Sequence, residues 1–125
     1  MKIKEKSAGT GQITIYHNPA CGTSRNALRA IIEAGRQPRI VNYLEAGWRR
    51  SDLVKLLAAM SLRARDILRV RGTPAEELGL TRAGVSDEAI LEAMTDHPIL
   101  VERPIVAGPN GVALCRPWEK VKALL

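Results

Sequence analysis

The first third of the chain contains a strand, a sharp break, a helix and a second strand, and this succession constrains the fold most strongly. Residues 12–17 (QITIYH) alternate polar and apolar side chains and are β-branched, which is typical of a strand. Residues 18–22 (NPACG) break that strand, and residues 38–44 predict another. The intervening helix is long enough to connect parallel strands, so we predict a β-α-β unit.

The helix between these strands is predicted from its cap, its end and its apolar face. Thr23 or Ser24 can accept hydrogen bonds from the N–H groups of the first turn. Gly35 is a typical residue at which a helix stops. The apolar side chains expected on one face are Leu28, Ile31 and Ile32.

The middle of the chain is predicted to be helical, and its end to be a β-hairpin followed by a helix. Residues 109–111 (PNG) are a turn signal between two short strands. The predicted strands cover residues 104–107 and 112–115. The predicted helices cover residues 51–60 (capped by Ser51), 63–69, 74–78, 86–97 (opened by Ser86) and 118–125.

Together these elements predict an α/β fold. The expected architecture is a thioredoxin-like mixed β-sheet flanked by helices, with a helical insertion between the β-α-β unit and the C-terminal β-hairpin. Residues 1–11 are interpreted as a flexible N-terminal tail. Residues 12–125 are interpreted as a single domain, with the helical insertion at about residues 51–97.

The composition disfavours several classes of protein. A net charge of +6 favours an anionic partner. Two Trp, two Tyr and no Phe are too few for base stacking, and no basic block resembles a nucleic-acid arm, so we expect no nucleic-acid partner. No stretch approaches the ~20 apolar residues that span a bilayer, so no membrane association is expected. With only two cysteines, we expect a cytoplasmic monomer with reduced thiols.

Cys21 follows the first strand at the start of the helix, and this position predicts a reactive thiolate. The unpaired N–H groups and the positive dipole end of a helix favour a thiolate over a thiol. His17 and Arg25 are close in sequence and can add positive potential. The alternative is a buried, inert cysteine, because free Cys is among the most buried residue types.

The residues that follow Cys21 exclude two mechanisms. Ser24 makes the segment C-x-x-S, which lacks the second thiol of a dithiol centre. Ala27 stands where the C-x5-R loop of tyrosine phosphatases has its arginine. A nucleophilic cysteine of this kind must be regenerated by an external thiol, for which glutathione and glutaredoxin are the candidates.

Residues 16–26 (YHNPACGTSRN) resemble the signature of the glutaredoxin-coupled arsenate reductases. The cysteine signature and a later Cys-Arg-Pro element are its most specific parts. The resemblance extends to the C-terminus, in the same order and at similar spacing, through residues 77–80 (ELGL), 97–100 (HPIL), 103–106 (RPIV) and 114–117 (LCRP).

The resemblance implies a role for six residues. Cys21 matches the catalytic nucleophile, His17 a histidine that lowers the pKa of the thiol, and Ser24 a serine that hydrogen-bonds near the thiolate. The Arg103–Pro104 bond matches one that is usually cis in thioredoxin folds. The arginines that match the substrate oxyanion-binding set are Arg69, Arg103 and Arg116.

Several of these residues also have a plainer structural explanation. Arg69 lies among other arginines and could be one more solvated charge. Arg116 could cap a hairpin, and His17 could be a structural histidine, an interpretation that we prefer for His97. We expect Cys115 to be structural, because by the resemblance the adjacent arginine carries the function.

The arginines are expected to act mainly on the charge of the substrate. Lowering the pKa of a cysteine by ~2 units raises its thiolate fraction roughly 25-fold at pH 7. Intrinsic nucleophilicity falls about 8-fold with the same shift, so the net gain is only ~3-fold. Neutralising and orienting an anionic arsenate that meets a thiolate is therefore the larger task.

The resemblance implies a three-step cycle with arsenate as substrate. The Cys21 thiolate attacks arsenate, glutathione attacks the resulting adduct as arsenic is reduced, and glutaredoxin then removes the glutathione so that arsenite leaves. Glutathione is a co-substrate in this cycle, and no bound cofactor is implied. No metal is expected either, because two His and two Cys show no ligand spacing.

Two other functions remain open from the sequence. A regulator of the same fold that binds RNA polymerase also has an N-terminal cysteine and an Arg-Pro pair, but lacks the element at residues 115–117 and often has C-x-x-C. A monothiol glutaredoxin-like protein would share a segment close to residues 21–24 (CGTS) and bind an iron–sulfur cluster with glutathione. The long helical insertion favours the reductase over the second alternative.

Overall fold

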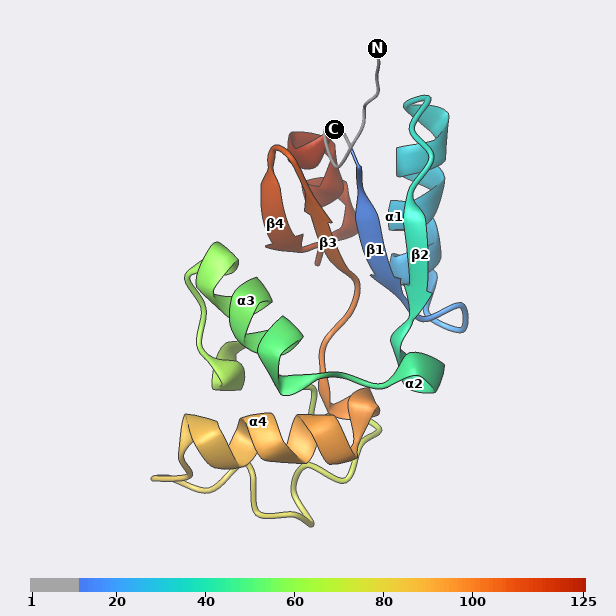
Figure 1. Cartoon of the computed structure of the whole chain (residues 1–125). Helices are drawn as coiled ribbons and strands as arrows, with labels where there is room; N and C mark the ends of the chain where they lie inside the picture. Colours follow the sequence, from blue (N-terminus) through green and yellow to red (C-terminus); the bar gives the residue numbers. More distant parts are fainter. Residues whose placement is uncertain (1–11) are drawn as a thin grey trace. The chain divides into compact units, whose positions relative to one another are not determined.

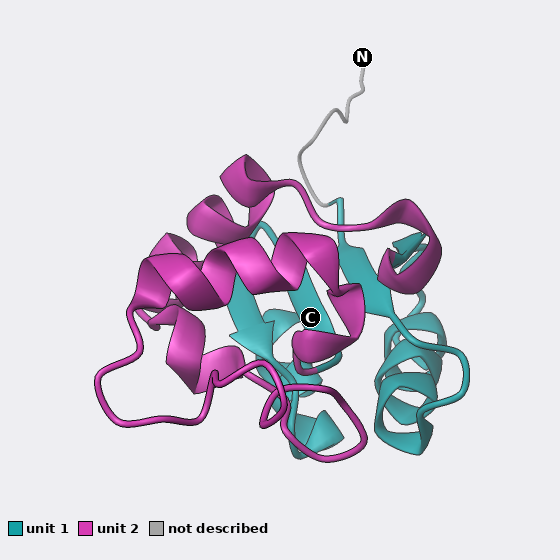
Figure 2. Cartoon of the chain, turned by 90° about the horizontal axis from the view of Figure 1, so that it is seen from below, with its two compact units in different colours: residues 1–42, 103–125 teal, residues 43–102 magenta. Residues whose placement is uncertain are grey.

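The computed structural model describes residues 12–125, and the predicted tail at residues 1–11 lies outside the described residues. The chain divides into two compact units (Figure 2). Among the described residues, unit 1 is formed by residues 12–42 and 103–125, and unit 2 by residues 43–102. The described helices include none that is long and apolar enough to cross a membrane.

Unit 1 contains a four-stranded mixed sheet in the order β2-β1-β3-β4 (Figure 1). β1 (Thr14–His17) pairs in parallel with β2 (Arg39–Asn42) on one side. On its other side β1 pairs antiparallel with β3 (Ile105–Gly108), which forms a hairpin with β4 (Gly111–Leu114). The predicted mixed sheet, β-α-β unit and C-terminal hairpin are thus confirmed.

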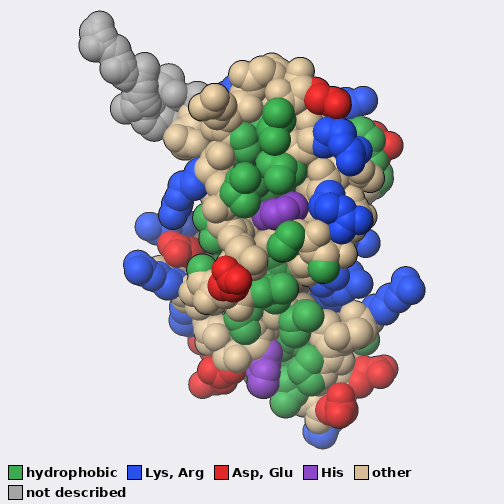
Figure 3. Space-filling view, turned by 90° about the vertical axis from the view of Figure 1, so that its right-hand side faces the viewer, with side chains coloured by type: hydrophobic (Ala, Val, Ile, Leu, Met, Phe, Trp, Pro, Cys, Tyr) green, Lys and Arg blue, Asp and Glu red, His purple; other side chains and the backbone are tan. Residues whose placement is uncertain are grey.

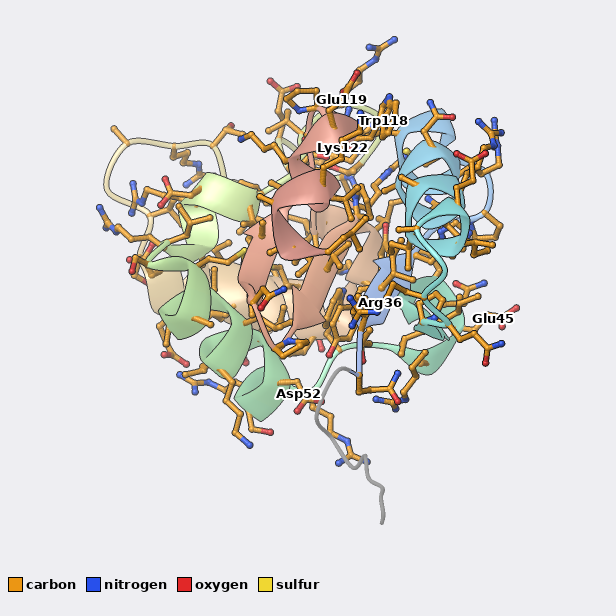
Figure 4. All side chains as sticks on the ribbon, turned by 90° about the horizontal axis from the view of Figure 1, so that it is seen from above. Arg36, Glu45, Asp52, Trp118, Glu119 and Lys122 are labelled. Carbon is orange, nitrogen blue, oxygen red and sulfur yellow. The ribbon has the colours of Figure 1, made fainter. Side chains whose placement is uncertain are left out.

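The core of unit 1 lies between this sheet and two helices, α1 (Gly22–Glu33) and the 3-10 helix η3 (Trp118–Leu124). η3 runs beside α1, with Lys122 5.5 Å from the centre of the Trp118 ring (Figure 4). The Arg36 guanidinium donates a hydrogen bond to the carbonyl of Leu125 at 3.3 Å. The buried side chains of this core are Ile13, Ile15, Ala27, Ile31, Val106, Cys115, Val121 and Leu124.

Helix α1 differs from the prediction at its start and on its apolar face. Its N-cap is Cys21 rather than Thr23 or Ser24, and no side chain caps its first turn. Ile31 is fully buried, but its neighbour Ile32 is 55% exposed. Each residue turns a helix by about 100°, so adjacent residues cannot both face the sheet.

Unit 2 is mainly helical, with three α-helices: α2 (Tyr43–Ala46), α3 (Arg50–Met60) and α4 (Asp87–Asp96) (Figure 1). Two short 3-10 helices, η1 (Ala64–Ile67) and η2 (Pro98–Leu100), flank α4 in sequence. The fully buried side chains of this unit include Tyr43, Leu53, Ile67, Ile90, Met94, Leu100 and Val101.

The caps and helix bounds observed in unit 2 agree with the sequence predictions only in part. Ser86 caps α4, because its hydroxyl accepts a hydrogen bond from the N–H of Ala89 at 3.0 Å, as predicted. Ser51 was the wrong cap, since Arg49 is the N-cap of α3. Residues 74–78 form turns rather than a helix, and the predicted helix at 63–69 is only the single turn of η1.

The contrast between Ile31 and Ile32 gives a test of the packing of α1. Ile31→Ala leaves a cavity in the core of unit 1 and should lower the free energy of unfolding by about 2–5 kcal/mol in urea denaturation. Ile32→Ala is the matched control and should change it by less than about 0.5 kcal/mol, because that side chain is exposed. Equal losses for the two variants would contradict the observed orientation of the helix.

Candidate active site

The sheet register of unit 1 brings three distant parts of the chain to one edge of the sheet. Tyr16 pairs with Ile105, and Ile105 pairs with Leu114. The C-terminal end of β1 therefore lies beside the start of β3 and the end of β4 (Figure 1). The loop that leads to Cys21, the segment before β3 and the segment after β4 all begin at this edge, which places Arg103 and Arg116 near Cys21.

The loop that holds Cys21 is organised by Asn18, whose role the sequence analysis missed. The Asn18 side-chain oxygen accepts a hydrogen bond from the N–H of Ala20 at 2.9 Å, and its carbonyl accepts one from the N–H of Cys21 at 3.0 Å. The Cys21 carbonyl in turn accepts the first bond of α1, from the N–H of Arg25 at 3.0 Å. The signal was the Asn-Pro pair, because asparagine stabilises turns in this way.

Ser24 and His17 form a buried hydrogen-bonded pair beneath this loop. The Ser24 hydroxyl accepts a hydrogen bond from the N–H of Asn18 at 3.1 Å and lies 2.6 Å from Nδ1 of His17. Ser24 is fully buried and His17 nearly so. The pair ties the end of β1 to the first turn of α1, which fixes the direction in which Cys21 leaves the loop.

His17 does not supply the positive charge that the sequence analysis expected beside the thiol. Burial, and next to it the charge of Arg25, lower the pKa of His17 below its ordinary value of 6.5. The imidazole is therefore mostly neutral at pH 7. His17 acts on the site through its contact with Ser24, as an orienting group.

The thiol of Cys21 is half-buried and has an acidic pKa. Partial burial raises the pKa, but a hydrogen bond from the Arg103 side chain, the Arg103 charge and the N–H groups of Ser24 and Thr23 outweigh it. The pKa of Cys21 falls from an ordinary value of 9.0 to about 7. About half of the molecules therefore carry a thiolate at neutral pH.

Arg116 links the two segments that approach Cys21. Its Nη1 donates a hydrogen bond to the carbonyl of Arg103 at 3.0 Å, and the same nitrogen lies 4.0 Å from the Cys21 sulfur. The latter distance is at the outer limit of a hydrogen bond to sulfur, so we assign the larger effect on the thiolate to Arg103. Arg103–Pro104, expected to be cis, is indeed cis, as is Arg116–Pro117.

Arg69 belongs to unit 2 and is not a solvated surface charge. Its side chain is only 16% exposed and donates a hydrogen bond to the Glu102 carboxylate at 2.9 Å. Its Nε also donates to the carbonyl of Arg71 at 3.1 Å. The sequence analysis missed Glu102. Its position next to Arg103 was its only signal in the sequence. Assignment of Arg69 to the oxyanion-binding set stays a prediction.

The second cysteine, for which a structural role was predicted, lies in the core. Cys115 is completely buried in the core of unit 1. Burial raises the pKa of its thiol to about 11, against a smaller opposing effect of the Lys120 charge. A thiol in this state is a poor nucleophile at neutral pH.

The chemistry of the site in unit 1 is that of a thiolate beside two guanidinium groups. Guanidinium groups bind oxyanions through forked hydrogen bonds, and the thiolate is a nucleophile. In residues 12–125 no group of three or more His, Cys, Asp or Glu side chains is placed to hold a metal ion. The arrangement therefore suits attack of Cys21 on an oxyanion held by arginine.

Comparisons with known proteins agree with this geometry. The model of the ArsC family matches residues 16–124. The chain is similar to arsenate reductases of Synechocystis sp. (51% identical, covering 90% of this chain and 81% of that protein) and Escherichia coli (50%, 90% and 80%). The solved structure of an arsenate reductase from Vibrio cholerae superposes with a TM-score of 0.87 at 34% identity, over 93% of this chain and 99% of that one.

The acidity of Cys21 can be measured by alkylation. The rate of iodoacetamide reaction with Cys21 should rise with pH around a midpoint of about 7, because only the thiolate reacts. Arg103→Met removes a hydrogen bond and a charge, so it should move the midpoint toward 9.0, and Arg116→Met should move it less. A Cys21→Ser control should remain unlabelled below pH 9, and a wild-type midpoint near 9 would contradict the described site.

Proposed function

Because the chain belongs to the ArsC family, we propose that it catalyses the reduction of arsenate to arsenite with Cys21 as the nucleophile. One observation carries this proposal: an acidic thiol lies beside two arginines in a chain half identical to arsenate reductases. The proposal requires arsenate to reach the Cys21 sulfur and to be held by Arg103 and Arg116.

In the first step the Cys21 thiolate attacks arsenic and displaces one oxygen of arsenate, which leaves as water after protonation. Arsenate carries one to two negative charges at neutral pH, as a phosphate ester does. Approach of a thiolate is therefore repulsive unless guanidinium groups offset the charge. Arg103 and Arg116 both approach the Cys21 sulfur, which supports this assignment.

The remaining steps need external thiols. Glutathione attacks the adduct, and overall two thiols are oxidised to one disulfide while arsenic gains two electrons and becomes arsenite. Glutaredoxin then takes the glutathionyl group and restores the Cys21 thiolate. The buried and weakly acidic Cys115 supports an external rather than an internal second thiol. Such a cycle suits the cytoplasm, where glutathione is kept reduced.

The two alternatives that the sequence left open have weaker support. The identity of about 50% is to proteins that bear the name arsenate reductase, and the similarity to the solved structure of another arsenate reductase, at 34% identity, extends over 93% of the chain. A polymerase-binding regulator would need no thiolate flanked by arginines. An iron–sulfur glutaredoxin-like protein would be coloured when purified.

A coupled assay tests the proposed activity. With arsenate, glutathione, glutaredoxin, glutathione reductase and NADPH, the protein should consume NADPH only when arsenate is present. Cys21→Ser should abolish this activity because it removes the nucleophile, and Cys115→Ser should retain it because that thiol is buried.

The two cysteine variants also separate the possible mechanisms. A folded wild-type protein without arsenate-dependent turnover would refute the proposed function. Equal loss of activity in Cys21→Ser and Cys115→Ser would indicate an internal disulfide relay instead of external glutathione.

The forked geometry of arginine can be tested separately from its charge. Arg116→Lys keeps the charge but loses the planar pair of donors, so kcat/KM for arsenate should fall by about 100-fold, as when one oxyanion donor is removed. The control is Lys122→Arg on η3, which makes the opposite exchange, from lysine to arginine, at a residue outside the proposed site. Unchanged kcat/KM in Arg116→Lys would show that charge alone suffices.

A further inference from the structure

The outer face of α1 forms an open groove that reaches the Cys21 loop and that the first chemical step does not use. Its volume is about 600 Å³, and His17 is one of its lining residues. Figure 3 shows this side of the molecule, where hydrophobic side chains gather beside a histidine with basic side chains along one flank. The other lining residues, which define the α1 groove, are Pro19, Arg25, Leu28, Arg29, Ile32 and Glu33.

The residues of the groove connect the Cys21 loop with the outer face of α1. Arg25, Leu28, Arg29 and Ile32 are spaced by three or four residues (25, 28, 32 and 25, 29, 32), so their side chains form one strip along the helix. Pro19, two residues before Cys21, also lines the groove, so a molecule bound in it has one end at the Cys21 loop. It also meets an apolar strip, because Leu28 is half-buried and Ile32 is 55% exposed.

The two arginines of the groove have defined directions. The Arg25 guanidinium donates a hydrogen bond to the carbonyl of Pro19 at 2.9 Å, which holds it beside the Cys21 loop. The Arg29 guanidinium donates to the side-chain oxygen of Asn26 at 3.0 Å, so it points back toward the start of the helix. Glu33 follows Arg29 by one turn. The groove thus presents two positive charges and then a negative one with increasing distance from Cys21.

We propose that the α1 groove binds glutathione, with its glycine carboxylate at Arg25 and its γ-glutamyl head at Arg29 and Glu33. Glutathione has two carboxylates and one ammonium group, and the ammonium shares a carbon atom with the γ-glutamyl carboxylate. This order of charges is complementary to Arg25, Arg29 and Glu33. The inference rests on the proposed function, because glutathione must reach the sulfur of Cys21.

The dimensions agree with a tripeptide. The glutathione sulfur is on the central residue, and the eight bonds from this sulfur to the γ-glutamyl carboxylate carbon span roughly 9 Å when extended. The helix rises about 7.5 Å between Cys21 and Asn26, where the Arg29 guanidinium is held. A glutathione whose sulfur meets Cys21 can therefore reach both guanidinium groups.

The size of the groove favours this small molecule over a protein. The groove volume falls within the range of about 300–1,000 Å³ that is typical of small-molecule sites. A stable protein–protein interface needs roughly 800 Å² from each partner, far more than the five side chains that α1 contributes to the groove can provide.

The binding can be measured without arsenate, through reaction of Cys21 with glutathione disulfide. The Cys21 thiolate attacks one sulfur, the disulfide bond breaks, one glutathione leaves as thiolate, and Cys21 becomes joined to the other. Mass spectrometry follows the rate. The double variant Arg25→Met/Arg29→Met should react about 5-fold more slowly than the wild type, the loss expected for two exposed charge pairs.

Two controls separate binding from reactivity. Bis(2-hydroxyethyl) disulfide has no charges, so the wild type and the double variant should react with it at equal rates. The matched variant Arg49→Met/Arg82→Met removes two exposed arginines that do not line the groove, and it should react with glutathione disulfide like the wild type.

The single variants test the assignment of each end. The disulfide of cysteinylglycine lacks the γ-glutamyl head, so Arg29→Met should slow the reaction with glutathione disulfide but not the reaction with this analogue. Arg25→Met should slow both reactions, because both molecules keep the glycine carboxylate.

Three outcomes would overturn the proposal. One is an unchanged rate of the double variant with glutathione disulfide, and another is an equal loss with the uncharged disulfide. The third is a double variant that reacts with glutathione disulfide at the wild-type rate but from which glutaredoxin removes the glutathionyl group more slowly. This result would make the outer face of α1 a protein-docking site. Since the assay contains no arsenate, a protein that fails to reduce arsenate can still pass it.

Discussion

The pairing of β1 with β3 is the interaction on which the active site depends. It sets the end of β1, which leads to Cys21, beside the segment that carries Arg103, and the β3–β4 hairpin adds Arg116 at the same edge. A shift of one residue in this register would turn the inward side chains of β3 outward. Burial of Ile105 and Val106, both fully inaccessible, therefore also fixes the position of the arginines.

The electrostatics of this edge affect the substrate more than the nucleophile. A fall in the pKa of Cys21 from 9.0 to about 7 raises the thiolate fraction at pH 7 roughly 50-fold. Intrinsic nucleophilicity falls about 8-fold over the same interval, which leaves a gain of roughly 6-fold. Removal of one oxyanion donor typically costs 10²–10³-fold in rate, so charge stabilisation of arsenate by Arg103 and Arg116 is the larger contribution.

Burial is the main reason why His17 is neutral, because a charged imidazole without a counterion is disfavoured there. The nearby charge of Arg25 disfavours a further cation at this place. A neutral ring can instead pair with the Ser24 hydroxyl, which is also buried and needs a hydrogen-bond partner. His17 thus provides the hydrogen-bond partner of Ser24 beneath the Cys21 loop, and Arg103 supplies the positive charge that stabilises the Cys21 thiolate.

Sequence patterns predicted the strands, the hairpin turn and the Ser86 cap because each of these depends mainly on neighbouring residues. Local patterns failed where longer-range contacts decide. Residues 74–78 have a helix-like start but do not form a helix, and η1 ends at Ile67 because Leu68 is extended and forms a β-bridge with Val101. The motif resemblance pointed to Cys21 and the arginines, whose roles stay predictions. It did not point to Asn18, whose signal was the Asn-Pro pair, or to Glu102, whose contact with Arg69 joins residues 33 positions apart.

The wrong prediction for Ile32 and the presence of the α1 groove have the same cause, which is that α1 carries apolar side chains on two of its faces. An apolar residue next to a buried one was assigned to the core, because a sequence pattern does not show which of two adjacent faces packs against the sheet. The structure uses both faces: Ala27 and Ile31 are buried, and Ile32 is exposed in line with Cys21. An exposed isoleucine between charged residues contributes little to stability. Its place along the face that starts at the reactive sulfur is better explained by contact with a molecule that must reach that sulfur.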